Sequence, residues 1–335
     1  MKDEDRRVRV RNALIGIAYG DSFGMPVEMW DTVTIRSKVG KVEGLQSGCP
    51  DNPISSKLKR GMVTDDTMNS LIVTDVLAKN HGTVDAKLFI EELRRWIATS
   101  ENSASIVGPS TRRAMELIDQ GVPMEESGAR GTTNGGAMKI LPVGLVNGLN
   151  GAINPDKLIH DVVELCRPTH YTSGAISAAC AIAGGGALAI TGIDDVNRIF
   201  DYMKEMADRG ARCGMQWGGP SVSARMELGR YFANHFQRTE ALDLLYRIIG
   251  TSVVSEQSIP AAVVIFYMSK GDPYECARMC ANIGGDTDTM AAMACGICGA
   301  MSDDPVLFGD EDVSLLEQVN DIDFEAWTDK ILSCR

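Results

Sequence analysis

Two carboxylates and two threonine hydroxyls stand directly before an uncharged run of small residues near the end of this chain. They belong to the segment Ile283-Gly284-Gly285-Asp286-Thr287-Asp288-Thr289, and residues 290–298 after it carry no charge. This order predicts a buried helix whose first turn contains the acids. One Asp there would be explained as a helix cap. Two acids that enter the interior together are costly unless a cation or protons neutralise them. The fold must therefore accommodate this charge.

A second segment far away in the sequence has the same composition. Thr64-Asp65-Asp66-Thr67 also follows a glycine, Gly61, and precedes apolar residues at helical spacing. If the two helix starts meet, their oxygen atoms suit Mg²⁺, Mn²⁺ or Ca²⁺ better than a metal that prefers thiolates. We therefore expect one site that holds two Mg²⁺ or Mn²⁺ ions, as in two-metal catalysis. The expected ligands are Thr64, Asp65, Asp66, Asp286, Asp288 and Thr289.

The pattern along the chain predicts an all-α fold. Aromatic residues make up only 6% of the 335 residues, whereas the chain has 34 Gly and 17 Met, and such small or flexible residues favour closely packed helices over sheets. We expect an orthogonal bundle of about a dozen helices. Because motifs from both ends of the chain are expected to build one site, residues 1–335 are expected to form a single domain.

Four segments give more specific expectations. A helix should run from Asp65 to near Asn80. Residues 31–61, rich in Gly and Pro, predict a long loop over the site, with at most a short ribbon. The uncharged segment 171–193 predicts a buried helix that breaks or bends at Gly184–Gly186; its Ala, Gly, Ser and Thr content argues against a membrane span. Residues 313–332 predict one closing amphipathic helix.

Charge and cysteine content restrict the partners and the compartment. A net charge of −12 argues against a nucleic-acid partner. The nine cysteines are an odd number without the spacing of a secreted scaffold, so free thiols in a reducing cytoplasm are expected. Two pairs, at 276/280 and 295/298, have apolar neighbours and no evident supporting ligands, so we interpret them as core residues rather than a zinc site. The charged start of the chain does not resemble a signal peptide, and no membrane partner is expected.

A glycine-rich segment at 127–139 is the candidate substrate-binding loop. Its glycines leave backbone N–H groups free to bind an anion or a sugar, and the spacing of a P-loop lysine is absent. A plain surface loop is the alternative interpretation. His170, between a proline turn and the uncharged helix, is a candidate for the same pocket, although a lone His is more often structural. The predicted substrate-binding residues are Gly131, Thr132, Thr133, Asn134, Gly135 and His170.

These segments together resemble the ADP-ribosylglycohydrolase family, which includes the enzyme that reactivates ADP-ribosylated dinitrogenase reductase. The resemblance implies that the 127–139 segment holds the ribose and, in binders of ADP-ribose, the diphosphate. It also implies that His170 lies beside the nucleotide ribose and that Glu28 lies on a mobile loop that reaches the metals. The matching segments, in the family's order, are Gly20-Asp21-Ser22-Phe23-Gly24 with Glu28, Thr64-Asp65-Asp66-Thr67, Thr133-Asn134-Gly135-Gly136-Ala137-Met138, Arg167-Pro168-Thr169-His170 and Gly284-Gly285-Asp286-Thr287-Asp288-Thr289.

The expected activity is hydrolysis of a glycosidic bond at the anomeric carbon of a ribose. Two metal ions would orient the ribose hydroxyls and lower the pKa of a bound water molecule, while a carboxylate serves as general acid or base. Glu28, Asp65 and Asp66 are the candidate catalytic residues, and the choice between Asp65 and Asp66 for activating water stays open. The substrate would be an ADP-ribose-containing small molecule or an ADP-ribosylated protein.

Two other functions remain. Thr132 stands where some ADP-ribose binders have an aromatic residue, and Lys139 stands where an Arg commonly follows the Met. These departures leave room for hydrolysis of a nucleoside or another small N-riboside. The second alternative is a protein that binds metal and ADP-ribose without turnover, and the intact acidic positions of the motifs argue against it.

Overall fold

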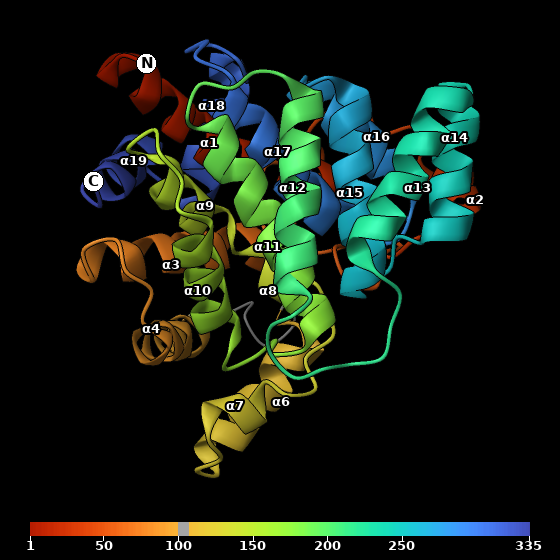
Figure 1. The fold of residues 1–335 in the computed structure, drawn as a ribbon. Helices are drawn as coiled ribbons and strands as arrows, with labels where there is room; N and C mark the ends of the chain where they lie inside the picture. Colours follow the sequence, from red (N-terminus) through yellow and green to blue (C-terminus); the bar gives the residue numbers. More distant parts are fainter. Residues whose placement is uncertain (100–106) are drawn as a thin grey trace.

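The computed structural model describes residues 1–99 and 107–335, and helices dominate it (Figure 1). No strand is found in these residues; two isolated β-bridges join Thr133 to Val254 and Thr172 to Met215. The all-α prediction is confirmed, but the described part contains eighteen α-helices rather than about a dozen. They are α1 (Asp3–Gly24), α2 (Thr32–Lys38), α3 (Asp65–Lys79), α4 (Ala86–Thr99), α6 (Pro109–Asp119), α7 (Met124–Ser127), α8 (Gly135–Met138), α9 (Leu141–Gly148), α10 (Pro155–Cys166), α11 (Ser173–Ala189), α12 (Val196–Gly210), α13 (Val222–His235), α14 (Arg238–Leu244), α15 (Ser255–Ser269), α16 (Pro273–Ile283), α17 (Thr287–Met301), α18 (Asp310–Asn320) and α19 (Phe324–Leu332).

Helices α1 and α17, from opposite ends of the chain, touch along their backbones. Gly16, Gly20 and Gly24 recur every fourth residue and so form one stripe on α1. A Cβ atom added to Gly20 would lie 2.2 Å from the carbonyl oxygen of Ala291, and one added to Gly24 would lie 2.4 Å from that of Thr287. Both distances are far below van der Waals contact, so only glycine permits this approach. The contact brings the end of α1 beside the start of α17.

The uncharged helix α11 is buried, as predicted, but it continues without a break through Gly184–Gly186. The expected break is wrong because neighbouring side chains occupy the space that the glycines leave. A Cβ atom on Gly184 would lie 2.7 Å from Cγ of Met206, and one on Gly186 would lie 2.5 Å from Cδ1 of Leu141. These glycines therefore serve close packing against α12 and α9. In the described part of the chain, no helix combines the length and apolarity needed to cross a bilayer.

Two other expectations need correction. The predicted loop 31–61 contains the helix α2, whose first turn is capped because Asp31 Oδ1 accepts hydrogen bonds from the backbone N–H groups of Val33 and Thr34 at 2.8 Å. The predicted single helix 313–332 is two helices. Asp321 adopts a left-handed conformation (φ 54°) that ends α18, and Asp323 caps the start of α19. By contrast, α3 spans Asp65–Lys79 as expected.

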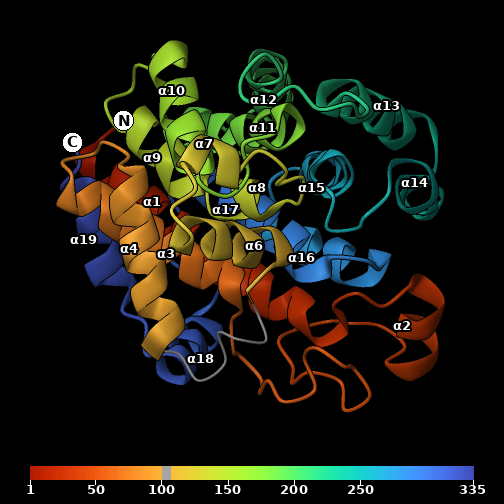
Figure 2. The same cartoon turned by 90° about the horizontal axis from the view of Figure 1, so that it is seen from below.

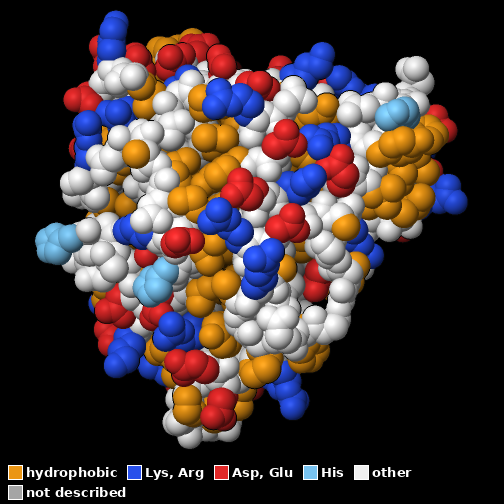
Figure 3. All heavy atoms as spheres, viewed as in Figure 1, with side chains coloured by type: hydrophobic (Ala, Val, Ile, Leu, Met, Phe, Trp, Pro, Cys, Tyr) orange, Lys and Arg blue, Asp and Glu red, His pale blue; other side chains and the backbone are white. Residues whose placement is uncertain are grey.

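The lower end of the bundle is where the starts of several helices meet. Seen from below, α6 and α8 lie over α17, with α3 alongside and α2 farther out (Figure 2). The face in Figure 3 mixes acidic and basic side chains, and apolar ones gather over α13 and α14 beside a histidine.

All nine cysteines are free thiols, and those at positions 276, 280, 295 and 298 are buried. None belongs to a metal-sized group of ligands among the described residues.

The glycine stripe predicts a specific sensitivity of the fold. The substitution Gly20→Ala should lower the free energy of unfolding by about 2 kcal/mol or more, because the added methyl group overlaps the α17 backbone. This loss would outweigh the gain of roughly 1 kcal/mol that Ala ordinarily brings to a helix. Urea unfolding followed by circular dichroism measures the change. Gly44→Ala is the control, since a Cβ atom there meets nothing within 4 Å; equal stability of the two variants would contradict the packing argument.

Candidate active site

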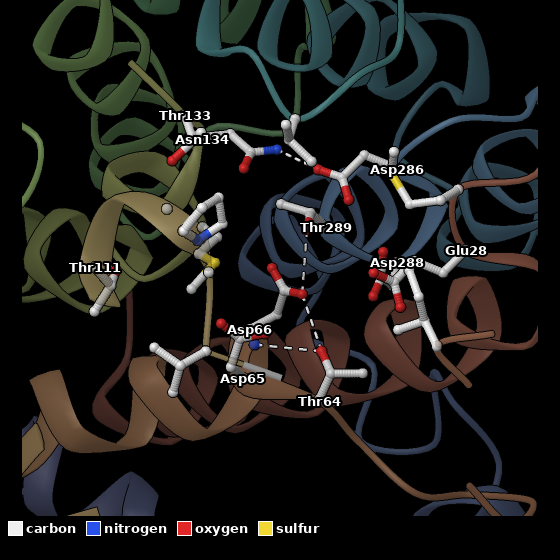
Figure 4. Close-up of a pocket in the computed structure, with 18 of the residues that line it drawn as sticks. Glu28, Thr64, Asp65, Asp66, Thr111, Thr133, Asn134, Asp286, Asp288 and Thr289 are labelled. Atoms are coloured by element: carbon white, nitrogen blue, oxygen red, sulfur yellow. Dashed lines mark hydrogen bonds between the residues drawn. The ribbon is translucent and has the colours of Figure 1, made fainter. Parts of the chain in front are cut away.

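A cavity of about 260 Å³ opens where the starts of α3 and α17 meet the glycine-rich segment (Figure 4). Its floor is acidic, and its walls combine apolar residues with threonine, asparagine and histidine. Ile54 and Leu58 of the loop after α2 also line it, so part of the long 31–61 segment does reach the site as expected. The residues around the cavity are Glu28, Met29, Ile54, Leu58, Thr64, Asp65, Asp66, Val107, Gly108, Pro109, Thr111, Thr133, Asn134, Gly135, Met138, His170, Val253, Asp286, Asp288 and Thr289.

The start of α3 is held by an aspartate from α1. Asp21, fully buried, accepts hydrogen bonds from the backbone N–H groups of Thr64 at 2.9 Å and Thr67 at 3.1 Å. It also accepts one from the Thr67 hydroxyl at 2.5 Å. These bonds satisfy two of the free N–H groups at the helix start and place a negative charge at the positive end of its dipole. Asp21 therefore fixes where Asp65 and Asp66 stand.

The start of α17 is formed by two glycines in the left-handed region, Gly284 (φ 88°) and Gly285 (φ 86°). Gly285 exchanges backbone hydrogen bonds with the segment after Glu28: its oxygen accepts from Met29 N–H at 2.7 Å, and its N–H donates to Trp30 at 2.8 Å. A Cβ atom on Gly285 would lie 2.2 Å from the carbonyl oxygen of Thr251. The glycine is thus required for the turn that holds Glu28 against Asp286 and Asp288.

The fold brings the remote acids together in two overlapping groups. Side-chain oxygens of Asp21, Asp66 and Asp288 lie within 4.8 Å of one another, and so do those of Glu28, Asp286 and Asp288. Asp288 belongs to both groups, and in Figure 4 it points toward Glu28. Asp65 lines the cavity but belongs to neither group. Of the predicted ligands, Asp66, Asp286 and Asp288 therefore belong to these groups, whereas Asp65 belongs to neither. Glu28, which was expected on a loop that reaches the metals, joins one group, and Asp21, which was not predicted as a ligand, joins the other.

Threonine hydroxyls connect the two helix starts through Asp66. Its Oδ2 accepts hydrogen bonds from Thr64 Oγ1 at 3.0 Å and from Thr289 Oγ1 at 3.3 Å. Across the cavity, the Asn134 amide donates to Asp286 Oδ2 and, at 3.0 Å, to Ser258 Oγ. The orientations of Asp66 and Asp286 are therefore fixed before any ligand binds.

Burial raises the pKa values of all these carboxyl groups, and repulsion between the acids adds to the rise for every one except Asp21 and Asp286. Burial raises the pKa of Glu28 to about 8, with further contributions from Asp286 and Asp65. Burial, followed by repulsion from Asp21, also raises the pKa of Asp65 to about 8. The pKa values of Asp66 and Asp288 are raised well above their usual value for the same two reasons. None of these groups forms an ion pair with Lys or Arg in the described residues, so the charge within the site is uncompensated.

The donor set fits hard divalent cations. Asp66 Oδ1 and Asp288 Oδ1 are buried and have no hydrogen-bond partner among the residues that the structure describes. A buried carboxylate oxygen without a partner is costly, and a cation placed between two such oxygens removes both the desolvation cost and the repulsion. The donors are all oxygen atoms, as Mg²⁺ and Mn²⁺ prefer. The residues present thus satisfy the chemical requirements for such ions.

The polar wall contains most of the predicted substrate-binding residues. Thr133, Asn134, Gly135 and His170 line the cavity. Gly131 and Thr132 do not: Gly131 lies at a second cavity nearby, and the carbonyl oxygen of Thr132 accepts a hydrogen bond from Ser255 N–H at 3.1 Å. His170 is packed so closely against Gly135 that a Cβ atom there would lie 2.8 Å from Nε2. Burial lowers the pKa of His170 well below its usual value, so the imidazole is neutral near pH 7.

The second cavity, of about 240 Å³, shares Pro109 and Thr133 with the first. Two arginines, Arg113 and Arg130, line it, and neither forms an ion pair within the described part of the chain. This pair was not predicted, because the arginines are separated in the sequence and belong to no motif. Asp21 was also not predicted as a member of the acidic site, although it is the one charged residue in the segment 12–27.

Comparisons with known proteins show which proteins this chain resembles. Residues 2–303 match the family model of the ADP-ribosylglycohydrolases. The chain is 31% identical over 333 residues to the uncharacterized protein YegU of Escherichia coli strain K12, covering 98% of this chain and 97% of that one. It is 26% identical over 335 residues to mouse ADP-ribosylhydrolase ARH3, covering 87% and 83%. A solved structure described as an ADP-ribosylglycohydrolase-related protein complex has the same fold, with a TM-score of 0.72, 23% identity and 98% of each chain covered.

The raised carboxyl pKa values predict how stability depends on pH and cations. Without metal, the folded protein holds more protons than the unfolded chain above pH 6.5, so its free energy of unfolding should fall as pH rises to about 8. The lowered pKa of His170 has the opposite effect only below about pH 6.5, where the unfolded chain's histidine takes up its proton. Thermal unfolding in EDTA at the two pH values measures this. Saturating Mg²⁺ or Mn²⁺ should restore the stability lost at pH 8. A stability that changes with neither pH nor cation would contradict a cation-binding site here.

Proposed function

Because the chain belongs to the ADP-ribosylglycohydrolase family, we propose that it is a hydrolase, dependent on two divalent cations, that cleaves the glycosidic bond at the anomeric carbon of a ribose. The substrate that the site supports best is an ADP-ribosyl group on a protein or a small molecule. The observation that carries the proposal is the pair of three-carboxylate clusters that share Asp288 and, apart from Asp21, line the cavity. Within the described residues, two buried oxygens of these clusters have no hydrogen-bond partner.

The residues that would hold the cations are the acids of the two three-carboxylate clusters, together with the threonines at the helix starts. When bound, the cations supply positive charge that orients the 2′- and 3′-hydroxyls of the ribose and lowers the pKa of water in the site. Glu28 lies in the turn after the short 3-10 helix Met25–Val27, in the segment joined to Gly285, whereas Asp21, Asp66 and Asp288 lie within helices and Asp286 precedes the first residue of α17. Glu28 is therefore the ligand best suited to be displaced by substrate. The proposed ligands are Asp21, Glu28, Thr64, Asp66, Asp286, Asp288 and Thr289.

Asp65 is the proposed proton carrier. Hydrolysis breaks the bond between the anomeric carbon and the leaving atom, forms a bond from that carbon to a water oxygen, and transfers a proton from water to the leaving group. The carrier must reach the cavity yet not be committed to a cation. Of the adjacent pair, Asp66 belongs to a carboxylate group and accepts two threonine hydrogen bonds, whereas Asp65 lines the cavity outside both groups.

The second cavity supports an ADP-ribosyl substrate over a simple nucleoside. Its guanidinium groups, from Arg113 and Arg130, lack carboxylate partners among the described residues although the chain has a net charge of −12. Unpaired arginines beside a ribose site are complementary to phosphate oxygens. A nucleoside has no group that would use them, whereas a ribose joined to a diphosphate would extend from the acidic cavity into this one.

Metal removal and two matched variants test the activity. EDTA should abolish hydrolysis of ADP-ribosyl-arginine, and Mg²⁺ or Mn²⁺ should restore it. Asp288→Asn should weaken cation binding about tenfold or more, measured by calorimetry. Asp65→Asn should retain cation binding yet lose about 100-fold in kcat, as expected for a proton carrier. Asp310→Asn, at an exposed position, is the control. Full activity in EDTA would contradict the proposal, and tight ADP-ribose binding without any product would favour a non-catalytic binding protein.

Arginine variants test the substrate class. Arg113→Ala with Arg130→Ala should raise KM for an ADP-ribosyl substrate at least about tenfold, because charge-assisted hydrogen bonds to phosphate are lost. The same double variant should leave hydrolysis of any nucleoside unchanged. Arg36→Ala, an exposed arginine away from both cavities, is the control. A wild-type protein that hydrolyses nucleosides but not ADP-ribosyl-arginine would contradict the assignment while retaining the cation-dependent chemistry.

A further inference from the structure

Lys139 is a buried lysine for which the proposed chemistry gives no role. Its side chain is 1% exposed, at the end of the glycine-rich segment and behind the cavity wall. The ammonium donates a hydrogen bond to the Gly135 carbonyl oxygen at 2.7 Å and to Thr169 Oγ1 at 3.5 Å, and it lies 5.1 Å from the centre of the Phe89 ring. No carboxylate forms an ion pair with it in the described residues. A buried cation kept without an ionic partner is costly.

A row of hydrogen bonds leads from Lys139 to the cavity wall. Thr169 Oγ1 lies 2.8 Å from Nδ1 of His170. On the other side of the ring, Nε2 lies 3.0 Å from Thr133 Oγ1. Thr133 Oγ1 in turn donates to Ser110 Oγ at 2.9 Å. His170 and Thr169 are buried, and Thr133 and Ser110 both line the second cavity.

The ammonium fixes the direction of every bond in this row, because it can donate but never accept. If His170 Nδ1 carried the hydrogen and donated it to Thr169, the Thr169 hydroxyl hydrogen would have no acceptor among the described residues. Such a buried, unsatisfied donor is costly. Thr169 must therefore donate to Nδ1, and the neutral ring must carry its hydrogen on Nε2. Nε2–H then donates to Thr133, whose own hydrogen goes to Ser110.

We propose that Lys139 is a positioning residue whose ammonium orients the chain Lys139, Thr169, His170, Thr133 and Ser110, so that His170 carries its hydrogen on Nε2 and Ser110 presents a donor to the ligand. Ser110 Oγ donates to no acceptor within the described part of the chain. Its hydrogen therefore faces the cavity that Arg113 and Arg130 line, where it complements an anionic oxygen. The effect on the ligand rests on the proposed function, whereas the direction of the bonds depends only on the protein.

Nitrogen-15 NMR of the labelled full-length protein tests the direction directly. The long-range ¹H–¹⁵N correlations of an imidazole distinguish its two neutral tautomers and the charged form. The chain has only four histidines, and the other three are exposed, so His170 is assigned by the signals lost in His170→Gln. We expect wild-type His170 to be neutral with its hydrogen on Nε2. A hydrogen on Nδ1, or a charged ring at pH 7, would overturn the proposal without any variant being needed.

Variants then test the role of Lys139 and its effect on the ligand. Lys139→Met should replace the single His170 tautomer by a mixture, while the exposed control Lys87→Met should not; an unchanged tautomer in Lys139→Met would overturn the role of the ammonium. Thr169→Val should raise KM for the ADP-ribosyl substrate about fivefold with kcat nearly unchanged, and Thr169→Ser should restore it. An equal fall of kcat in both Thr169 variants would indicate a merely structural effect. A protein without activity on any riboside would refute the proposed function and leave the tautomer result standing.

Discussion

The backbone contact between α1 and α17 is the constraint on which the site depends. Gly20 and Gly24 let the two helices approach so closely that a Cβ atom at either position would overlap the α17 backbone. Asp21 lies between these glycines on α1. The same approach places Asp21 within 4.8 Å of Asp288 at the start of α17. A side chain at either glycine would separate the two acids by pushing the helices apart. The close packing that stabilises the bundle thus also concentrates negative charge inside it.

That concentration is unstable without compensation. The positive ends of two helix dipoles offset part of the negative charge. Asp21 accepts hydrogen bonds from backbone N–H groups at the start of α3, and Asp288 lies in the first turn of α17. The remaining repulsion is met either by protons, as the raised pKa values indicate, or by cations. The proposed divalent cations would therefore compete with protons for the same oxygens, and their binding would release protons at neutral pH. The hydroxyls and amide around Asp66 and Asp286 limit how these carboxylates can rearrange between the two states.

The sequence was informative where a local pattern determines local structure. The starts of α3 and α17 were predicted correctly because acids and hydroxyls before apolar residues have few alternative conformations. The acidic role of Asp21 was missed because it depends on a contact across the fold. The unbroken helix at Gly184–Gly186 was mispredicted for a related reason: glycine lowers helix propensity, but packing against Met206 and Leu141 outweighs it. Likewise, the division of the last helix follows from one left-handed residue, Asp321, which the amphipathic pattern alone does not reveal.

The two neighbouring cavities carry opposite charges, because acids line one and arginines line the other. Among the described residues, the carboxylates of the first cavity and the arginines of the second form no ion pairs, and Thr133 and Pro109 line both cavities. Opposite charges so close together would ordinarily attract and form ion pairs. Here Arg113 and Arg130 are carried by α6 and by the loop before Gly131, so the wall stands between them and the acids. The proposed substrate, with vicinal hydroxyls at one end and an anionic group at the other, would therefore use both cavities at once, whereas a ligand with only one of these features would use one cavity.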